Sequence, residues 1–492
     1  MKNNYFLFLL SVLLGLSGNS QTICQTVYEN YWIPNNSVFA SVRSSNTVYI
    51  GGAFTQVGPS TGCGTLIDMN TGNPNLSFDK VNSSIMTSVS DGSGGWYIGG
   101  YFTRVGDVQR NKLAHINADG SLDMDWNPSV TGGDPTIRTI AVSGTTVFVG
   151  GNFSAVDGYS RDNLAAINAL SGEVIDNWVC NTNSYVFTLA ASGSVLYTGG
   201  LFTSIGGTNR NFLAAINADN GQVLNNWIPN PDDGVLRIVP SGNLVYVGGA
   251  FTHIGSPNPQ PRNLIAAIDA DGRATDWDPN VTPPYSGAFV YSILVAEETI
   301  YIAGGFSAVG GQPRTSVAEV YIDSGEPTDW APTVSGFLKD VLTLSISDGI
   351  VYLGGEFTTV NGEPRFCLAA VEEVTGDVTD WNPHPHEAVL TISLSGTNIY
   401  TGGRFFGIGG VERNHLAAFD ATTGMLLDWN PNVEGDVQNP AGYSIGLVKK
   451  LDYQISEFYD PFDRDALFFD AGELTDPNVF SIAVEGSTVL VG

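Results

Sequence analysis

The sequence has little positive charge, few cysteines and histidines, and no long apolar run after residue 16. Only 20 lysines and arginines stand against 49 aspartates and glutamates, which gives a formal net charge of −29. Such a field repels phosphate backbones and anionic lipids, so we expect no nucleic-acid partner. No stretch contains the ~18 apolar residues that a membrane-spanning helix needs, so we also expect no direct membrane insertion.

The four cysteines are too sparse for a disulfide framework or a zinc site. Cys24 and Cys63 lie in the atypical first part of the chain, and a disulfide between them stays open as an alternative. We interpret Cys180 and Cys367 as buried thiols. The sequence also lacks a Gly-x-Ser-x-Gly elbow, a zinc-protease histidine motif and a phosphate-binding loop, so we predict no catalytic residues.

The N-terminus resembles an export signal. Lys2 precedes an apolar run from Tyr5 to Leu16, and small residues follow at the expected distances before a cut ahead of Gln21. Residues 1–20 are therefore predicted to be a signal peptide, and the protein to be secreted or held at the cell surface.

Glycine, in contrast, is abundant, with 59 residues, and it marks an internal repeat. A Tyr-x-Gly-Gly-x-Phe segment, or its equivalent, recurs eight times at steps of 48 to 55 residues. A period near 50 is typical of propeller blades. The first position of the pair falls at Gly51, Gly99, Gly150, Gly199, Gly248, Ala303, Gly354 and Gly402.

Each copy contains four short strand candidates, as in the copy that ends at Trp227. A sheet of about 50 residues cannot bury two aromatic faces alone, so neighbouring copies must stack. We predict an all-β fold, a β-propeller of four-stranded antiparallel blades over residues 21–435, with eight blades expected and seven or nine as alternatives. Residues 479–492 begin a further copy, which either closes the ring together with Val27 to Trp32 or marks a truncated array.

The repeat resembles a known family. Residues 402–431 read Gly-Gly-x-Phe, then Gly-Gly-x-x-Arg-Asn-x-Leu-Ala-Ala-Phe-Asp, then Gly and Asp-Trp-Asn-Pro. This pattern is similar to the delta-60 type propeller repeat, which is related to the kelch-like repeats and to those of cortical cell-polarity markers. The resemblance covers about residues 36–435 and implies a propeller fold, but it implies no defined chemistry.

Residues that recur from copy to copy are interpreted as structural. The tryptophans close the blades, and the arginines fall in the loop between the second and third strands, where their guanidinium groups can bind loop carbonyls. An anionic glycan bound by the arginine ring is the alternative. The shared residues are Trp126, Trp178, Trp227, Trp277, Trp330, Trp381 and Trp429, and Arg110, Arg161, Arg210, Arg262, Arg314, Arg365 and Arg413.

Features that occur in one copy are the candidates for binding, because variable loops on a rigid scaffold usually carry recognition. Tyr285 lies in a proline-rich link and can stack on a sugar. The segment His384-Pro-His386-Glu387 combines imidazole with carboxylate, although no third metal ligand is in view. The insertion 436–478 is rich in aromatic and acidic residues, with Tyr443 and Tyr459 as candidate contacts, and is expected to pack on the propeller rim.

Together these patterns predict a secreted, monomeric, non-enzymatic module for binding or surface assembly. Its expected partner is carbohydrate or a surface protein, and no cofactor is expected. Asp460, Asp463 and Asp465 leave Ca²⁺ as an alternative, although they lack the spacing of a known calcium loop. The alternative function is a secreted propeller-fold oxidoreductase or carbohydrate-active enzyme.

Overall fold

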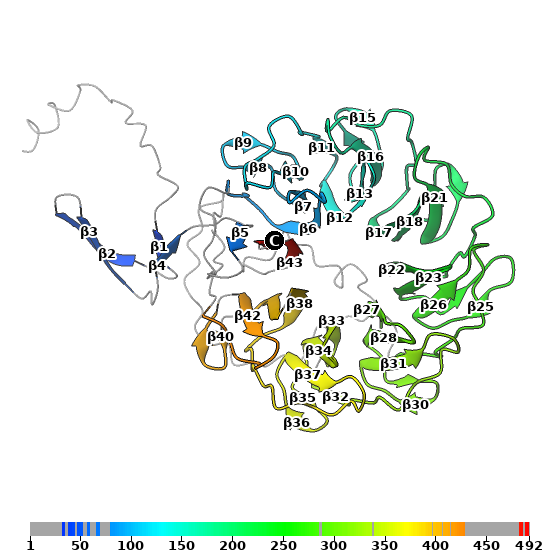
Figure 1. The fold of residues 1–492 in the computed structure, drawn as a ribbon. Helices are drawn as coiled ribbons and strands as arrows, with labels where there is room; N and C mark the ends of the chain where they lie inside the picture. The colour runs from blue at the N-terminus through cyan, green and yellow to red at the C-terminus, as the bar shows by residue number, and fades with distance from the viewer. Residues whose placement is uncertain are drawn as a thin grey trace, which may run out of the picture. The chain divides into compact units, whose positions relative to one another are not determined.

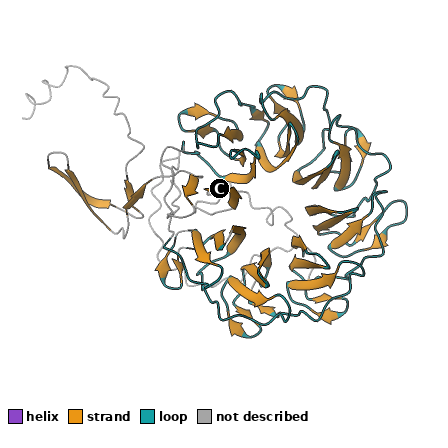
Figure 2. Ribbon diagram, in the orientation of Figure 1, coloured by secondary structure: helices purple, strands orange, loops and turns teal. Residues whose placement is uncertain are grey.

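The computed structural model describes residues 32–34, 38–44, 47–52, 57–59, 65–68, 482–485 and 488–491, and residues 79–428 apart from 285–287, 337–338, 396, 406 and 414. These residues form strands and loops and contain no helix (Figure 2), and hence no helix long and apolar enough to cross a membrane. The chain divides into two units, Met1–Ser60 and Thr61–Gly492.

Three-stranded antiparallel sheets of one type make up most of the larger unit. Their inner strands are β6 (Ile85–Ser90), β12 (Thr136–Ser143), β17 (Val186–Ser192), β22 (Val235–Ser241), β27 (Val290–Val295), β33 (Val341–Ser347), β38 (Val389–Ser395) and β43 (Ile482–Glu485). Their middle strands are β7 (Trp96–Gly100), β13 (Thr146–Asn152), β18 (Val195–Gly200), β23 (Leu244–Gly249), β28 (Thr299–Gly304), β34 (Ile350–Gly355), β39 (Asn398–Gly403) and β44 (Thr488–Val491). Their third strands are β10 (Leu113–Ile116), β16 (Leu164–Asn168), β21 (Leu213–Asn217), β26 (Ile265–Ile268), β31 (Val317–Tyr321), β37 (Leu368–Glu372), β42 (Leu416–Asp420) and β5 (Thr65–Asp68).

Neighbouring inner strands contact each other in cyclic order, from β6 through β12, β17, β22, β27, β33, β38 and β43 and back to β6. The sheets stand side by side around a common middle (Figure 1), which is the arrangement of a β-propeller. The predicted all-β propeller is thus confirmed. The number of blades in the whole chain stays a prediction.

The sheet that closes this ring is composite. Strands β43 and β44 belong to the incomplete last copy, and their third strand is β5 of the first copy, with Leu490 opposite Leu66. The sequence suggests Val27 to Trp32 as an outer strand of this blade. Of that segment the structure describes Trp32, which belongs to β1 (Trp32–Pro34) and pairs with β4 (Val57–Pro59) in the smaller unit. The other two strands of that unit, β2 (Val38–Ser44) and β3 (Thr47–Gly52), form a hairpin.

A short hairpin fills each connection between the middle and third strands. These hairpins are β8 (Arg104–Val105) with β9 (Val108–Gln109), β14 (Ala155–Val156) with β15 (Tyr159–Ser160), β19 (Ser204–Ile205) with β20 (Thr208–Asn209), β24 (His253–Ile254) with β25 (Gln260–Pro261), β29 (Ala308–Val309) with β30 (Gln312–Pro313), β35 (Thr359–Val360) with β36 (Glu363–Pro364), and β40 (Gly407–Ile408) with β41 (Val411–Glu412). The link that arrives from the preceding blade pairs with the hairpin, either through β11 (Val130–Thr131) and β32 (Val334–Ser335) or through single bridges. Links and hairpins therefore share one face of the ring.

The paired glycines allow close approach on two sides. A Cβ on Gly150 would collide with the side chain of Val186 in the next blade. A Cβ on Gly151 would lie against the carbonyl oxygen of Thr136 in its own inner strand. The first glycine therefore permits blades to pack, and the second permits the inner strand to bulge.

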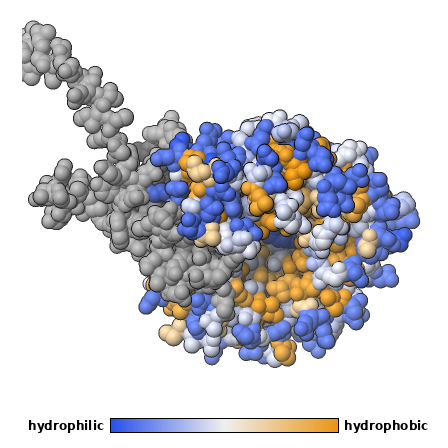
Figure 3. All heavy atoms as spheres, turned by 45° about the horizontal axis from the view of Figure 1, so that its top comes forward, coloured by the Kyte–Doolittle hydropathy of each residue, from blue (hydrophilic) through white to orange (hydrophobic). Residues whose placement is uncertain are grey.

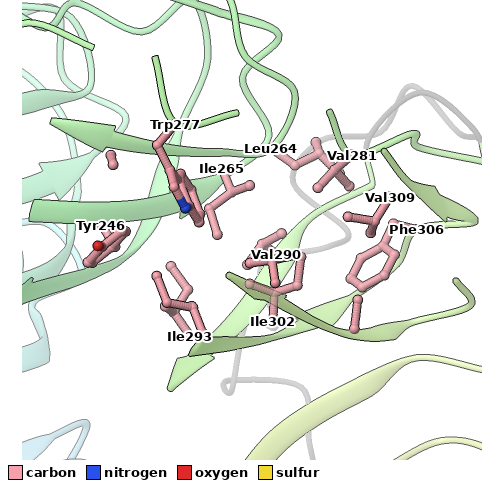
Figure 4. Packing of buried hydrophobic residues seen from close by; sticks show 14 of the residues in the cluster. Tyr246, Leu264, Ile265, Trp277, Val281, Val290, Ile293, Ile302, Phe306 and Val309 are labelled. Atoms are coloured by element: carbon pink, nitrogen blue, oxygen red, sulfur yellow. The ribbon is translucent and has the colours of Figure 1, made fainter. Parts of the chain in front are cut away.

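The core lies between neighbouring blades. In the contact shown in Figure 4, Tyr246 and Trp277 of one blade pack with Val290, Ile302 and Phe306 of the next, and all five are buried. Burial of such large apolar surfaces is the main force that joins the blades.

The predicted fourth strand is mostly absent from the described blades. After a single bridge, such as that between Ile216 and Val223, the chain turns, and the Trp227 amide N–H donates to the Leu224 carbonyl. Residues 224–227 form a turn because they include the turn-forming Asn225 and Asn226, and this turn directs the Trp227 ring towards the next blade. The prediction of four regular strands was therefore wrong for the outer position.

Candidate functional site

The inner strands β6, β12, β17, β22, β27, β33 and β38 each carry a bulge where the links enter. The register between inner and middle strands slips by one residue beside the glycine pair, which leaves one inner-strand residue without a partner. An unpaired bulge residue is re-aimed relative to the regular strand. The bulge residues differ between copies and are Met86, Arg138, Phe187, Leu236, Tyr291, Leu342 and Leu390.

Neighbouring bulges contact each other across blade boundaries. The guanidinium carbon of Arg138 lies 5.6 Å from the centre of the Phe187 ring. Arg237, which follows the bulge of its own strand, donates an Nε–H···O bond of 2.6 Å to the Tyr291 carbonyl. Within two blades a second ring flanks the bulge, with Tyr185 and Phe187 6.2 Å apart. Phe289 and Tyr291 are 5.9 Å apart.

These residues surround the middle of the ring. The inner strands lie nearest to it in Figure 1, and the space-filling view in Figure 3 shows a hollow there, with apolar residues along its visible wall. Phe187 and Tyr291 are partly exposed, and Arg237 is exposed. Inner strands β12, β17, β22 and β27 therefore present arginine, aromatic, arginine and aromatic side chains in that order.

Two carboxylates, Asp340 and Glu356, lie in the blade that follows Tyr291 around the ring. Asp340 precedes β33, and its carbonyl accepts a 2.9 Å bond from the Glu356 amide. Glu356 follows the glycine pair of the same blade and forms a 3.5 Å ion pair with Arg404 of the next blade. Burial raises the pKa of Asp340 to about 6, with the charge of Glu356 adding to the shift and Lys339 opposing it. Burial also raises the pKa of Glu356, although Arg404 opposes that shift.

We call this set the channel-mouth cluster. It offers flat aromatic faces together with charged hydrogen-bond donors and acceptors, which is the chemistry that binds the apolar face and the hydroxyls of a sugar ring. Its members are Arg138, Phe187, Arg237, Tyr291, Asp340, Glu356 and Arg404.

The predicted His384, His386 and Glu387 lie in one link, which is held by the next blade's hairpin. The Gly409 amide donates to the His384 carbonyl, and the His386 amide donates to the Gly407 carbonyl. The His384 ring packs 4.4 Å from Phe366 and 6.4 Å from His386. Within the described ranges, no group of three metal-ligating side chains is found.

Three other candidates cannot be placed. Tyr285, Tyr443 and Tyr459 lie outside the described residues, as do the export signal, the insertion 436–478 and Trp429. Their roles stay predictions.

The repeated arginines bind scaffold carbonyls. Arg365 donates from Nη1 to the Pro364 carbonyl at 2.8 Å and from Nη2 to the Thr379 carbonyl at 2.6 Å. The same pattern holds in other copies, from Arg110 to Arg314, and Arg262 adds an ion pair with Asp278. Arg413 donates from Nη2 to the Leu427 carbonyl. These guanidinium groups are turned into the protein.

The repeated tryptophans join neighbouring blades. Trp227 is buried, its ring packs at a tilt 5.3 Å from that of Tyr197 in the same blade, and its Nε1 donates to the Asp269 carbonyl of the next blade at 3.0 Å. Gly272 has a positive φ of 78° and lies so close to Trp227 that a Cβ would collide with its backbone. Equivalent indole bonds are made by Trp126, Trp178, Trp277, Trp330 and Trp381.

A second copy-specific cluster lies on the opposite face. His115 replaces the alanine of other copies and bonds through Nδ1 to Asp123 (2.9 Å) and through Nε2 to Asp91 (3.1 Å). Burial alone raises the pKa of Asp91, but hydrogen bonds from the Ser93 backbone and from His115 outweigh it and hold that pKa below its usual value. His115 is nearly buried and its ring stacks 4.5 Å from Tyr97, so this closed network is structural.

Sequence reasoning missed the channel-mouth cluster. Arg138 and Arg237 interrupt the otherwise largely apolar inner strands β12 and β22. A charged residue in an otherwise buried strand was the available signal.

A match to a family model supports the propeller fold. Residues 92–125 match a family model described as a domain of unknown function (DUF5122) with a beta-propeller, and no curated protein matches the chain. Among solved structures, the computationally designed Ika8 protein is 15% identical at a TM-score of 0.47, covering 76% of this chain and 96% of that one. The WD40 propeller domain of Doa1 is 10% identical at 0.40, covering 68% and 93%. The extracellular domain of BT4673 of B. thetaiotaomicron, a proposed one component system, is 14% identical at 0.40, covering 70% and 39%.

Proposed function

We propose that the chain is a secreted, non-enzymatic binding module that takes carbohydrate at the channel-mouth cluster. The observation that carries the proposal is the pair of partly exposed aromatic side chains, Phe187 and Tyr291, on inner strands separated by one blade and flanked by hydrogen-bonding groups. Aromatic faces that stand on a rigid sheet bind a sugar ring at little entropic cost. A surface protein bound on the same face is the other partner predicted from the sequence.

The test is a glycan array followed by calorimetric titration of each hit. We expect binding of at least one oligosaccharide, and a loss of tenfold or more in affinity for Phe187→Ala and Tyr291→Ala. The matched control is Tyr159→Ala, which removes an exposed ring from a hairpin on the outer side of a blade. Wild-type affinity in both aromatic variants would refute the assignment of the site.

One observation favours a carbohydrate-active enzyme as a second candidate. Asp340 has a pKa of about 6 and lies beside Glu356, and a raised carboxyl pKa is what a general acid of glycoside hydrolysis needs. Incubation with the oligosaccharides identified on the array, followed by analysis for shorter products, separates the two functions. Turnover that is abolished in Asp340→Asn would establish the enzyme, and unchanged oligosaccharides would exclude it for those ligands.

A further inference from the structure

Two of the three arginines in the channel-mouth cluster, Arg138 and Arg237, differ from the third, Arg404, which is paired with Glu356. The chain has 49 acidic and 20 basic residues, so an arginine has many possible carboxylate partners. Arg138 and Arg237 nevertheless contact no carboxylate among the residues that the structure describes. Arg138 lies over the Phe187 ring, and Arg237 donates to the backbone carbonyls of Tyr291 and Leu236.

The fold does not require these two arginines. The repeated arginines, such as Arg210, occupy a fixed loop position and bind carbonyls there in copy after copy. Arg138, in contrast, takes a bulge position that holds Met86 or Leu342 in other blades. Arg237 stands where other inner strands carry threonine, for example Thr188. Two guanidinium groups at copy-specific positions therefore have no carboxylate partner among the described residues, so they can pair with an anionic ligand.

The two arginines bracket one aromatic blade. Arg138 lies on β12, Phe187 on the next inner strand β17, and Arg237 on β22, after which comes Tyr291 on β27. A guanidinium group recognises a carboxylate or a sulfate by paired, charge-assisted hydrogen bonds, and the neighbouring ring stacks on the apolar face of the sugar that carries the anion. The acidic members of the cluster lie farther around the ring, where Glu356 is already paired with Arg404.

We propose that the ligand of the channel-mouth cluster is an acidic carbohydrate, an oligosaccharide bearing carboxylates or sulfates, whose anionic groups are bound by Arg138 and by Arg237. This inference rests on the proposed function and narrows its substrate class. The negative field of the protein as a whole would repel such a ligand, so the local pair of arginines must provide the selectivity.

The experiment uses the full chain and matched pairs of oligosaccharides. Oligogalacturonate is titrated against its neutral methyl ester, and a sulfated galactan oligosaccharide against its desulfated form, by calorimetry at pH 7. Wild-type protein should bind one acidic member at least tenfold more tightly than its neutral match, and the preference should weaken with added salt. The double variant R138Q/R237Q should lose this preference and retain its affinity for the neutral sugar within about threefold.

Two controls keep the outcome decisive. Arg273→Gln removes one positive charge from an exposed turn on the opposite face and should leave binding unchanged. Arg237→Lys keeps the charge but loses the planar fork, so it should weaken sulfate or carboxylate binding only partly. If R138Q/R237Q does not fold, as judged by circular dichroism, the exposed single change Arg237→Gln takes its place.

The outcomes separate the two proposals. Binding of neutral and acidic sugars with equal affinity, or an acidic preference that survives R138Q/R237Q, would overturn the inference and leave carbohydrate binding intact. Absence of binding to every sugar on the array and in both matched pairs would overturn the proposed function and the inference together.

Discussion

Replacing Asp340 by asparagine should stabilise the protein at alkaline pH. The folded environment raises the pKa of this carboxyl from 3.8 to about 6, mainly by burial and then by the charge of Glu356. The folded state therefore binds the proton more tightly than the unfolded state does. The stability that this group contributes is complete below pH 4 and is lost as the pH rises through 6.

The size of the effect follows from the shift. About two pKa units at ~1.4 kcal/mol each give roughly 3 kcal/mol as the largest destabilisation by the ionised carboxylate at pH 8. Asp340 is partly exposed, so solvent screening should reduce this to about 1 to 2 kcal/mol. Asparagine has nearly the same shape and cannot ionise, so Asp340→Asn should recover this amount at pH 8 and about half of it at pH 5.

The assay is unfolding in guanidinium chloride, followed by tryptophan fluorescence at pH 5 and pH 8. Both values lie above the sequence pI of about 4.2, so the protein keeps a net negative charge in each buffer. Asp380→Asn, which alters an exposed carboxylate, is the matched control and should change stability little at either pH. An Asp340→Asn variant that is equally stable relative to wild type at both pH values, or less stable at pH 8, would refute the reasoning.

Three further changes test the scaffold. Trp227→Ala should lower the free energy of unfolding by about 3 to 5 kcal/mol, because it removes a buried ring and its hydrogen bond to the Asp269 carbonyl. Chemical denaturation measures this loss, and a denaturation midpoint equal to that of the wild type would show that the ring is not part of the core. Gly200→Ala should be strongly destabilising since its Cβ would overlap a backbone carbonyl, whereas Gly133→Ala, with open space around it, should be nearly neutral; equal melting temperatures would contradict this contrast. Deleting residues 436–478, predicted from the sequence to pack on the rim, should leave the propeller folded and alter ligand binding; rapid proteolysis throughout that segment in the intact protein, with binding unchanged after cutting, would contradict a packed role.

The scaffold was predictable because it is repeated. Gly150, Trp227 and Arg210 each have equivalents at the same position of other copies. A residue type that every blade needs at one position therefore appears in a single sequence as a periodic pattern. The channel-mouth cluster has no such period. Arg138 and Phe187 meet across a blade boundary, 49 residues apart in sequence, because each occupies a bulge, and a bulge depends on strand register that no local pattern reveals.

The closing sheet was also beyond local reasoning. The incomplete last copy lacks its third strand, and the sequence suggested Val27 to Trp32 as the missing partner. The structure instead pairs Thr65–Asp68 of the first copy with β44. Strands β5 and β44 are far apart in the sequence. Their pairing depends on the geometry of the entire ring, which fixes where the last hairpin meets the first copy.

The composite sheet has the same strand order as the other sheets, so no blade of the described ring is marked as the first. Its inner, middle and third strands are β43, β44 and β5, as they are β6, β7 and β10 in the next sheet. Strand β5 nevertheless precedes the other two by about 420 residues in the sequence. A direct connection from β44 to β5 would thus convert the composite sheet into an ordinary repeat. The chain could then be opened at any exposed link between blades without changing a single strand pairing, so a family of circularly permuted proteins should share this fold while presenting their ends at different blades.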